Sequence, residues 1–171
     1  MTEGSAVVKP PWPAMPDLAL LLRLLGEAYD EKSWHGPSLR GSIRDIHFGT
    51  AAWRPAPERH NIGEIVVHCA YWKYAVRRRI LGEKRGSFPL KGSNWFARAG
   101  EASPEVWRAD IALLEDMHRE LRAVIATLSS RDLKRFPAGS RVPNVAVISG
   151  IAAHDVYHAG QIQLLKRLAR P

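Results

Sequence analysis

The chain has 171 residues, a formal net charge of +8, and 46% hydrophobic residues. That length and apolar content are typical of a single globular domain and argue against a disordered chain. No apolar run is long enough to cross a membrane, and the opening MTEGSAVVKPPWP lacks the pattern of a signal peptide, so we expect a cytoplasmic protein without membrane spans. The single cysteine, Cys69, excludes an internal disulfide and is consistent with a reducing compartment.

The positive charge is scattered along the chain. Its densest clusters are Arg77–Arg79 and a group near the C-terminus (Lys166, Arg167 and Arg170). No basic run is interleaved with aromatic residues in the manner of a nucleic-acid-binding module. We therefore interpret the basic residues as solvated helix faces and helix C-termini, where cations complement the helix dipole, and do not expect a nucleic-acid partner.

The first half of the chain predicts two helices separated by a long irregular stretch. Residues 1–16 contain four prolines and are expected to form an irregular lead-in. Residues 16–32, PDLALLLRLLGEAYDEK, show helical spacing of leucines with Asp17 as a candidate N-cap. Residues 32–60 are broken by glycines and prolines and are expected to form a loop, with a short helix in SLRGSIRDI. A second long helix is predicted from about Asn61 to Leu81 and ends at Gly82.

The second half predicts two more long helices. After a loop over residues 83–102, Ser103 can cap a helix that has Pro104 at its first position and continues to about Leu128. The last helix is predicted from about Asn144 to Leu168. Because no segment alternates like a strand, the pattern predicts one all-α domain over residues 1–171, a four-helix bundle with long crossover loops.

The last helix contains HDVYH, in which His154 and His158 are four residues apart. That spacing places both rings on one helix face, one turn apart, where two imidazoles can bind one metal ion at roughly 2.0–2.1 Å. Both lie in the apolar stripe between Ile151 and Leu165, so their ring nitrogens need partners inside the protein. Two separately hydrogen-bonded core histidines would also satisfy the pattern, but a matched pair favours a shared metal ion.

The second long helix offers a third histidine, His68, at the edge of its apolar stripe. Its position on the helix alone does not decide between a metal ligand and a structural histidine. Cys69 points about 100° away from it, so we interpret Cys69 as a small core residue and not as a co-ligand. HDVYH is also similar to the H-E-x-x-H motif of zinc proteases, but Asp155 is shorter than the catalytic glutamate and no third ligand follows downstream.

Three segments resemble the DinB/YfiT-like superfamily of metal-binding four-helix bundles: SWHGPSL (33–39), residues 51–72, and HDVYHAGQIQLLKRL (154–168). The most specific of them is HDVYHAGQI, together with a histidine near the middle of the second long helix. The resemblance covers most of the chain. It implies a divalent ion, usually nickel or zinc, held by His68, His154 and His158, and it implies a homodimer.

The resemblance implies several functions. Some members are transferases or isomerases that use a low-molecular-weight thiol such as bacillithiol or mycothiol with a small-molecule substrate. We favour this reading because three neutral histidines leave open positions on a metal, as in catalytic sites. A metal-dependent hydrolase using bound water, or a non-catalytic metal-binding stress protein, are the alternatives.

Four further residues are candidates for supporting the ligands or lining the pocket: Glu64, Gln161, His60 and Asp110. Gln161 lies one turn after His158, and Glu64 lies one turn before His68, so each can orient the neighbouring imidazole. His60 is expected to cap the second long helix or lie at the mouth of the site. Asp110 is either a carboxylate that serves the metal or a partly exposed acid near the start of its helix. Tyr157 is expected to pack away from the metal face.

Overall fold

The computed structural model describes residues 17–84, 86–96, 102–137 and 139–169, so the predicted lead-in over residues 1–16 lies outside the described residues. The described residues form seven helices and no strand, which confirms the all-α class. The helices are α1 (Asp17–Tyr29), α2 (Leu39–Ser42), α3 (Phe48–Ala52), α4 (Ile62–Leu81), α5 (Pro104–Ala126), α6 (Ser130–Leu133) and α7 (Asn144–Leu168). Within these ranges, no helix combines the length and apolar character that a membrane span needs.

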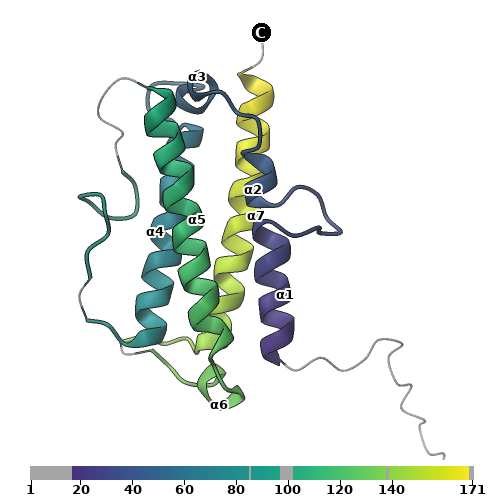
Figure 1. The fold of residues 1–171 in the computed structure, drawn as a ribbon, viewed down its shortest axis with the longest axis vertical. Helices are drawn as coiled ribbons and strands as arrows, with labels where there is room; N and C mark the ends of the chain where they lie inside the picture. Colours follow the sequence, from purple (N-terminus) through teal and green to yellow (C-terminus); the bar gives the residue numbers. More distant parts are fainter. Residues whose placement is uncertain (1–16, 85, 97–101, 138, 170–171) are drawn as a thin grey trace, which may run out of the picture.

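The four long helices α1, α4, α5 and α7 lie side by side (Figure 1). α4 and α5 both run away from the end that carries α3, so the chain between them returns along the whole bundle as a crossover. α1 and α7 run in the opposite direction, and α2 lies beyond α1 along the same helix α7. The metal-site candidates on α4 and α7 therefore come from two neighbouring helices of the bundle.

The ends of the helices follow local signals. Asn61 caps α4 by accepting a hydrogen bond from the backbone of Glu64, and Gly82 ends it in a left-handed conformation with φ of 73°. Ser103 caps α5 as predicted. α1 ends at Tyr29, three residues earlier than the predicted helix, and Asp17 is its first helical residue instead of its cap.

Two short helices were not predicted from the sequence. α3 has five residues and α6 has four, so neither is long enough to show an apolar periodicity. Both are defined by caps: the His47 side chain accepts from Gly49, and Ser129 with Asp132 forms a reciprocal capping box. The long loop predicted over residues 32–60 thus contains two short helices.

The bundle interior is mostly apolar, but it also contains an ion pair. Cys69 is fully buried in the core, as predicted, and burial raises the pKa of its thiol well above the ordinary value. Lys73 on α4 and Asp155 on α7 are both completely buried and form an ion pair across the two helices. Lys73, and not its half-buried neighbour Trp72, occupies the core face of α4.

Candidate metal centre

The structure brings His68 of α4 together with His154 and His158 of α7. The Nε2 atom of His154 lies 3.1 Å from Nε2 of His68 and 3.1 Å from Nε2 of His158. His68 and His158 are buried, and His154 is half-buried. One ligand atom from each ring therefore faces a common point, a geometry that could hold a single metal ion.

Burial keeps these histidines neutral. It lowers the pKa of His154 to about 3, with smaller contributions from the neighbouring His158, His68 and Lys73. Burial also lowers the pKa of His158 to about 4, against a raising effect of its hydrogen bond with Gln161. The pKa of His68 is lowered for the same reason, although its hydrogen bond to Asn94 opposes the shift. Neutral imidazole is the form that binds metal ions.

The opposite ring nitrogens determine which tautomer is present. The Nδ1 of His68 lies 2.8 Å from the backbone oxygen of Asn94, and the Nδ1 of His158 lies 2.6 Å from Oε1 of Gln161. Because a carbonyl oxygen can only accept, both Nδ1 atoms must carry the hydrogen, which leaves both Nε2 atoms as lone-pair donors. The Nδ1 of His154 is buried and has no hydrogen-bond partner among the described residues.

Gln161 is itself held by a surface residue. Its Nε2 donates to the hydroxyl of Tyr157 at 3.0 Å, which fixes the amide so that Oε1 faces His158. Tyr157, which was expected to pack away from the metal face, is 63% exposed and contacts Gln161 through its hydroxyl. A chain of contacts therefore runs from solvent at Tyr157 through Gln161 to the ring of His158.

Two residues of the crossover loop that the sequence reading did not select complete the surroundings of His68. Asn94 adopts a left-handed conformation with φ of 62°, and its side-chain oxygen accepts from Trp72 at 2.9 Å. Trp95 is stacked between His60 and His68, with ring centroids 3.6 and 3.9 Å away. The only sequence signal near Asn94 is Gly-Ser-Asn after Lys91. It indicates a turn, but not that this turn contacts His68.

Glu64 does not orient His68, contrary to one expectation from its spacing. Its carboxylate is bound by Arg54 at 2.5 and 3.0 Å and by Nδ1 of His60 at 3.0 Å. Burial alone would raise the pKa of Glu64, but these hydrogen bonds outweigh it and hold the pKa below the usual value. Glu64 thus acts on the site indirectly, because it holds His60 against Trp95.

The two remaining acids do not join the three Nε2 atoms. Asp110 on α5 is buried, where one expectation was a partly exposed acid, and its carboxylate lies beside Gly63 at the start of α4. Asp155 forms a second possible ligand group with Cys69 and His154, whose ligand atoms lie within 4.8 Å of one another. The Lys73 ammonium already neutralises Asp155, and a thiol with a raised pKa is a poor metal ligand. The three-histidine group is therefore the better candidate.

Fold and site together define a class of protein: an α-helical bundle in which three histidines from two neighbouring helices could hold a metal ion. The chain matches the family model of the DinB superfamily over residues 38–162, a stretch that includes all three histidines, and it belongs to that superfamily. Comparison with curated proteins and with solved structures found no match.

Proposed function

We propose that this DinB-superfamily protein holds a divalent ion, nickel or zinc, through His68, His154 and His158. We further propose that it works as a transferase that joins a low-molecular-weight thiol to a small electrophilic substrate. The observation that carries the proposal is the convergence of three Nε2 atoms, with 3.1 Å between neighbours, from rings that burial keeps neutral.

The donor set fits a divalent metal ion. Two of the three rings have their hydrogen fixed on Nδ1, so their Nε2 lone pairs both face Nε2 of His154. A divalent cation can accept both of these lone pairs together with that of His154. Imidazole nitrogen suits nickel and zinc, and three protein ligands leave a position open. When bound, such an ion lowers the pKa of a thiol or water ligand toward neutrality.

The carboxylates beside the ligands favour thiol chemistry over hydrolysis. A metal-dependent hydrolase commonly needs a carboxylate or histidine to take a proton from water. Asp155, next to His154, is bound to Lys73 in the core, and Glu64, one turn before His68, is bound to Arg54 and His60. A thiol supplies its own nucleophile and needs less help from a base, so these two occupied carboxylates fit a thiol substrate better.

We also propose that the protein is a homodimer, and the exposed face of α7 supports this. From Ala146 to Leu164 the exposed positions of α7 bear no charge: Ala146, Ser149, Gly150, Ala153, Tyr157, Gly160 and Leu164. Small side chains on such a face allow two helices to approach closely. Light scattering of the protein as it elutes from a size-exclusion column should give twice the mass of one chain. Leu164→Arg places a charge on this face and should reduce the measured mass to that of the monomer.

Metal binding is tested first, on protein purified without a histidine tag. Elemental analysis should find one nickel or zinc ion per chain, and His154→Ala and His158→Ala should each lose it. His35→Ala is the matched control, because His35 is exposed in the first loop and should leave metal content unchanged. Wild-type protein that takes up no nickel, zinc, manganese or iron would refute the site.

The reaction is tested on metal-loaded protein. Bacillithiol, mycothiol and glutathione-type thiols are each mixed with a panel of small electrophiles, and each electrophile is also incubated without thiol; loss of free thiol and loss of the electrophile are both followed. We expect turnover that needs both the thiol and the metal ion and that disappears in His154→Ala. Turnover without any thiol would point to a hydrolase instead, and metal binding without turnover would point to a non-catalytic protein.

A further inference from the structure

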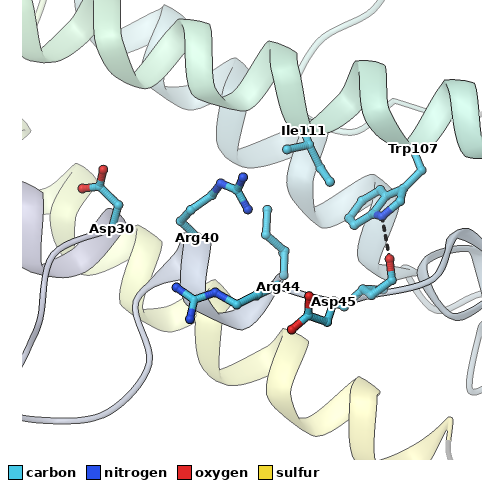
Figure 2. A pocket seen from close by; sticks show the side chains of 8 residues that line it. Asp30, Arg40, Arg44, Asp45, Trp107 and Ile111 are labelled. Atoms are coloured by element: carbon cyan, nitrogen blue, oxygen red, sulfur yellow. Dashed lines mark hydrogen bonds between the residues drawn. The ribbon is translucent and has the colours of Figure 1, made fainter.

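A cavity that is partly open to solvent lies apart from the histidines. It has a volume of about 490 Å³ and is lined by residues at the end of α1, on and after α2, and on α5 (Figure 2). None of its lining residues belongs to α4 or α7, the two helices that carry the histidines. Its size falls within the range of small-molecule pockets, so it is a separate candidate site.

Charged side chains of both signs surround this cavity. Arg40 uses its Nε to bind Glu115 at 2.6 Å, which leaves its terminal nitrogens for another partner. Within the ranges that the structure describes, the side chains of Asp30, Arg44 and Asp45 have no hydrogen bond or ion pair. Figure 2 shows these four side chains around the opening. The cavity thus offers guanidinium donors and carboxylate acceptors that the protein itself does not satisfy.

The wall formed by α5 is apolar and fixed. The indole Nε1 of Trp107 donates to the backbone oxygen of Ile46 at 2.9 Å, so the ring cannot turn and its polar atom is already satisfied (Figure 2). Ile111, one turn further along α5, extends this wall. Asp45, the residue before Ile46, has a left-handed backbone with φ of 58°, a conformation that aspartate tolerates better than most residues.

We propose that this cavity binds a small amino carboxylate with an apolar side chain. The guanidinium groups of Arg40 and Arg44 would bind the carboxylate, and the Asp45 carboxylate, with Asp30 near it, would bind the ammonium group. The apolar part would lie on Trp107. A purely anionic ligand would meet two carboxylates here, and a purely cationic ligand would meet two guanidinium groups, so a zwitterion fits the charges best.

The test uses three probes that share one branched apolar body and differ in charge: L-leucine, 4-methylpentanoate and 3-methylbutylamine. Isothermal titration calorimetry of the full chain should show saturable binding of L-leucine and at least about tenfold weaker binding of the other two. Arg44→Gln and Asp45→Asn should each weaken L-leucine binding by at least about tenfold. Both residues are exposed and unpaired among the described residues, and asparagine tolerates positive φ, so both variants should fold.

Two controls locate the site. Arg167→Gln removes an exposed charge on α7 and should leave L-leucine binding unchanged. His154→Ala should also leave it unchanged, because the cavity shares no residue with the metal centre; this separates the proposal from the proposed function. Equal binding of 4-methylpentanoate and L-leucine, loss of binding in His154→Ala, or no saturable binding of L-leucine up to about 10 mM would each overturn the proposal.

Discussion

Two polar clusters bridge the same pair of helices, and they differ in whether the protein completes them. Lys73 and Asp155 carry opposite charges and neutralise each other in the core. His68, His154 and His158 are three like groups whose Nε2 atoms face one another. The first cluster is complete in charge within the chain, although Oδ1 of Asp155 has no hydrogen-bond partner among the described residues. The second cluster offers ring nitrogens that could hold a metal ion from outside.

The surroundings of the ion pair show the same difference. The Lys73 ammonium also lies over the ring of Tyr29, 4.9 Å from its centroid, and Tyr29 stacks on His118 with centroids 3.6 Å apart. These contacts tie α1, α4, α5 and α7 together at one level of the bundle. In the histidine triad, Asn94 and Gln161 instead contact the outer ring nitrogens of His68 and His158, and they orient both rings so that their Nε2 lone pairs face Nε2 of His154.

The largest effect is expected from breaking the complete cluster. Lys73→Met should lower the free energy of unfolding by about 3–5 kcal/mol, because it leaves the buried Asp155 carboxylate without a partner. The double variant Lys73→Met with Asp155→Leu should recover much of that loss. Urea unfolding of metal-free protein measures both, with Arg23→Gln in the exposed Arg23–Glu27 pair as a control that should change little. If the double variant is as unstable as Lys73→Met alone, the loss does not come from the unpaired Asp155 carboxylate.

The contribution of the histidine triad to stability should depend on a bound metal ion and not on partners within the chain. Nickel or zinc at 100 times its dissociation constant should stabilise the wild type by about 2.7 kcal/mol, and chelation should remove that gain. His154→Ala should unfold at the same temperature with and without metal. Thermal unfolding with and without a chelator measures this. If the unfolding temperature of the wild type does not change with metal, the triad does not bind a metal ion and needs no ligand from outside, like the ion pair.

The orientation of the rings should matter less than their presence. Gln161→Leu removes the acceptor that fixes the His158 ring, and we expect metal affinity to fall by about tenfold to a hundredfold. Gln163→Leu, two residues further on α7, makes the same change away from the site and should keep wild-type affinity. Competition with a metal-sensitive dye measures both constants. Equal affinity in the two variants would show that the Gln161 contact does not support the site.

Local spacing explains what could be predicted from the sequence. His154 and His158 could be placed on one buried face because helical periodicity depends only on residues a few positions apart. His68 required the family resemblance, since one histidine at the edge of a stripe has no local signature. The contacts of Asn94 and Trp95 with His68 span more than 25 positions of the chain and depend on how the crossover loop folds back. Such contacts have no periodicity that a single sequence could reveal.

The buried ion pair was missed for a related reason. Lysine is rarely buried without a partner, so a lysine within an apolar stripe indicates either a helix edge or a distant carboxylate. Asp155 lies inside the HDVYH motif, where its position suggested comparison with a protease glutamate. The structure shows that it faces Lys73 across the bundle, a pairing of residues 82 positions apart. Only the packing of α4 against α7 makes the two positions meet.

The smallest expected effect is on how the free energy of unfolding depends on pH through His118, which stacks on Tyr29 beside the Lys73–Asp155 pair. Burial, with the charges of Lys73 and Arg122, lowers the pKa of His118 to about 2, against about 6.5 in the unfolded chain. The unfolded state therefore binds more protons below pH 6.5, and the contribution of neutral His118 to stability, complete above that pH, is lost as the pH falls. The loss should be about 1 kcal/mol per pH unit.

His118→Phe tests this sign in metal-free protein, because phenylalanine keeps the stacking on Tyr29 but cannot be protonated. The variant should lose less unfolding free energy than the wild type between pH 6.5 and pH 5, whatever its stability at neutral pH. His35→Phe changes an exposed histidine and should retain the wild-type slope. Identical slopes for His118→Phe and the wild type would mean that His118 accepts a proton in the folded bundle. In that case the cluster around Lys73 would accept protons from solvent. It would then differ from the histidine triad only in not binding a metal ion.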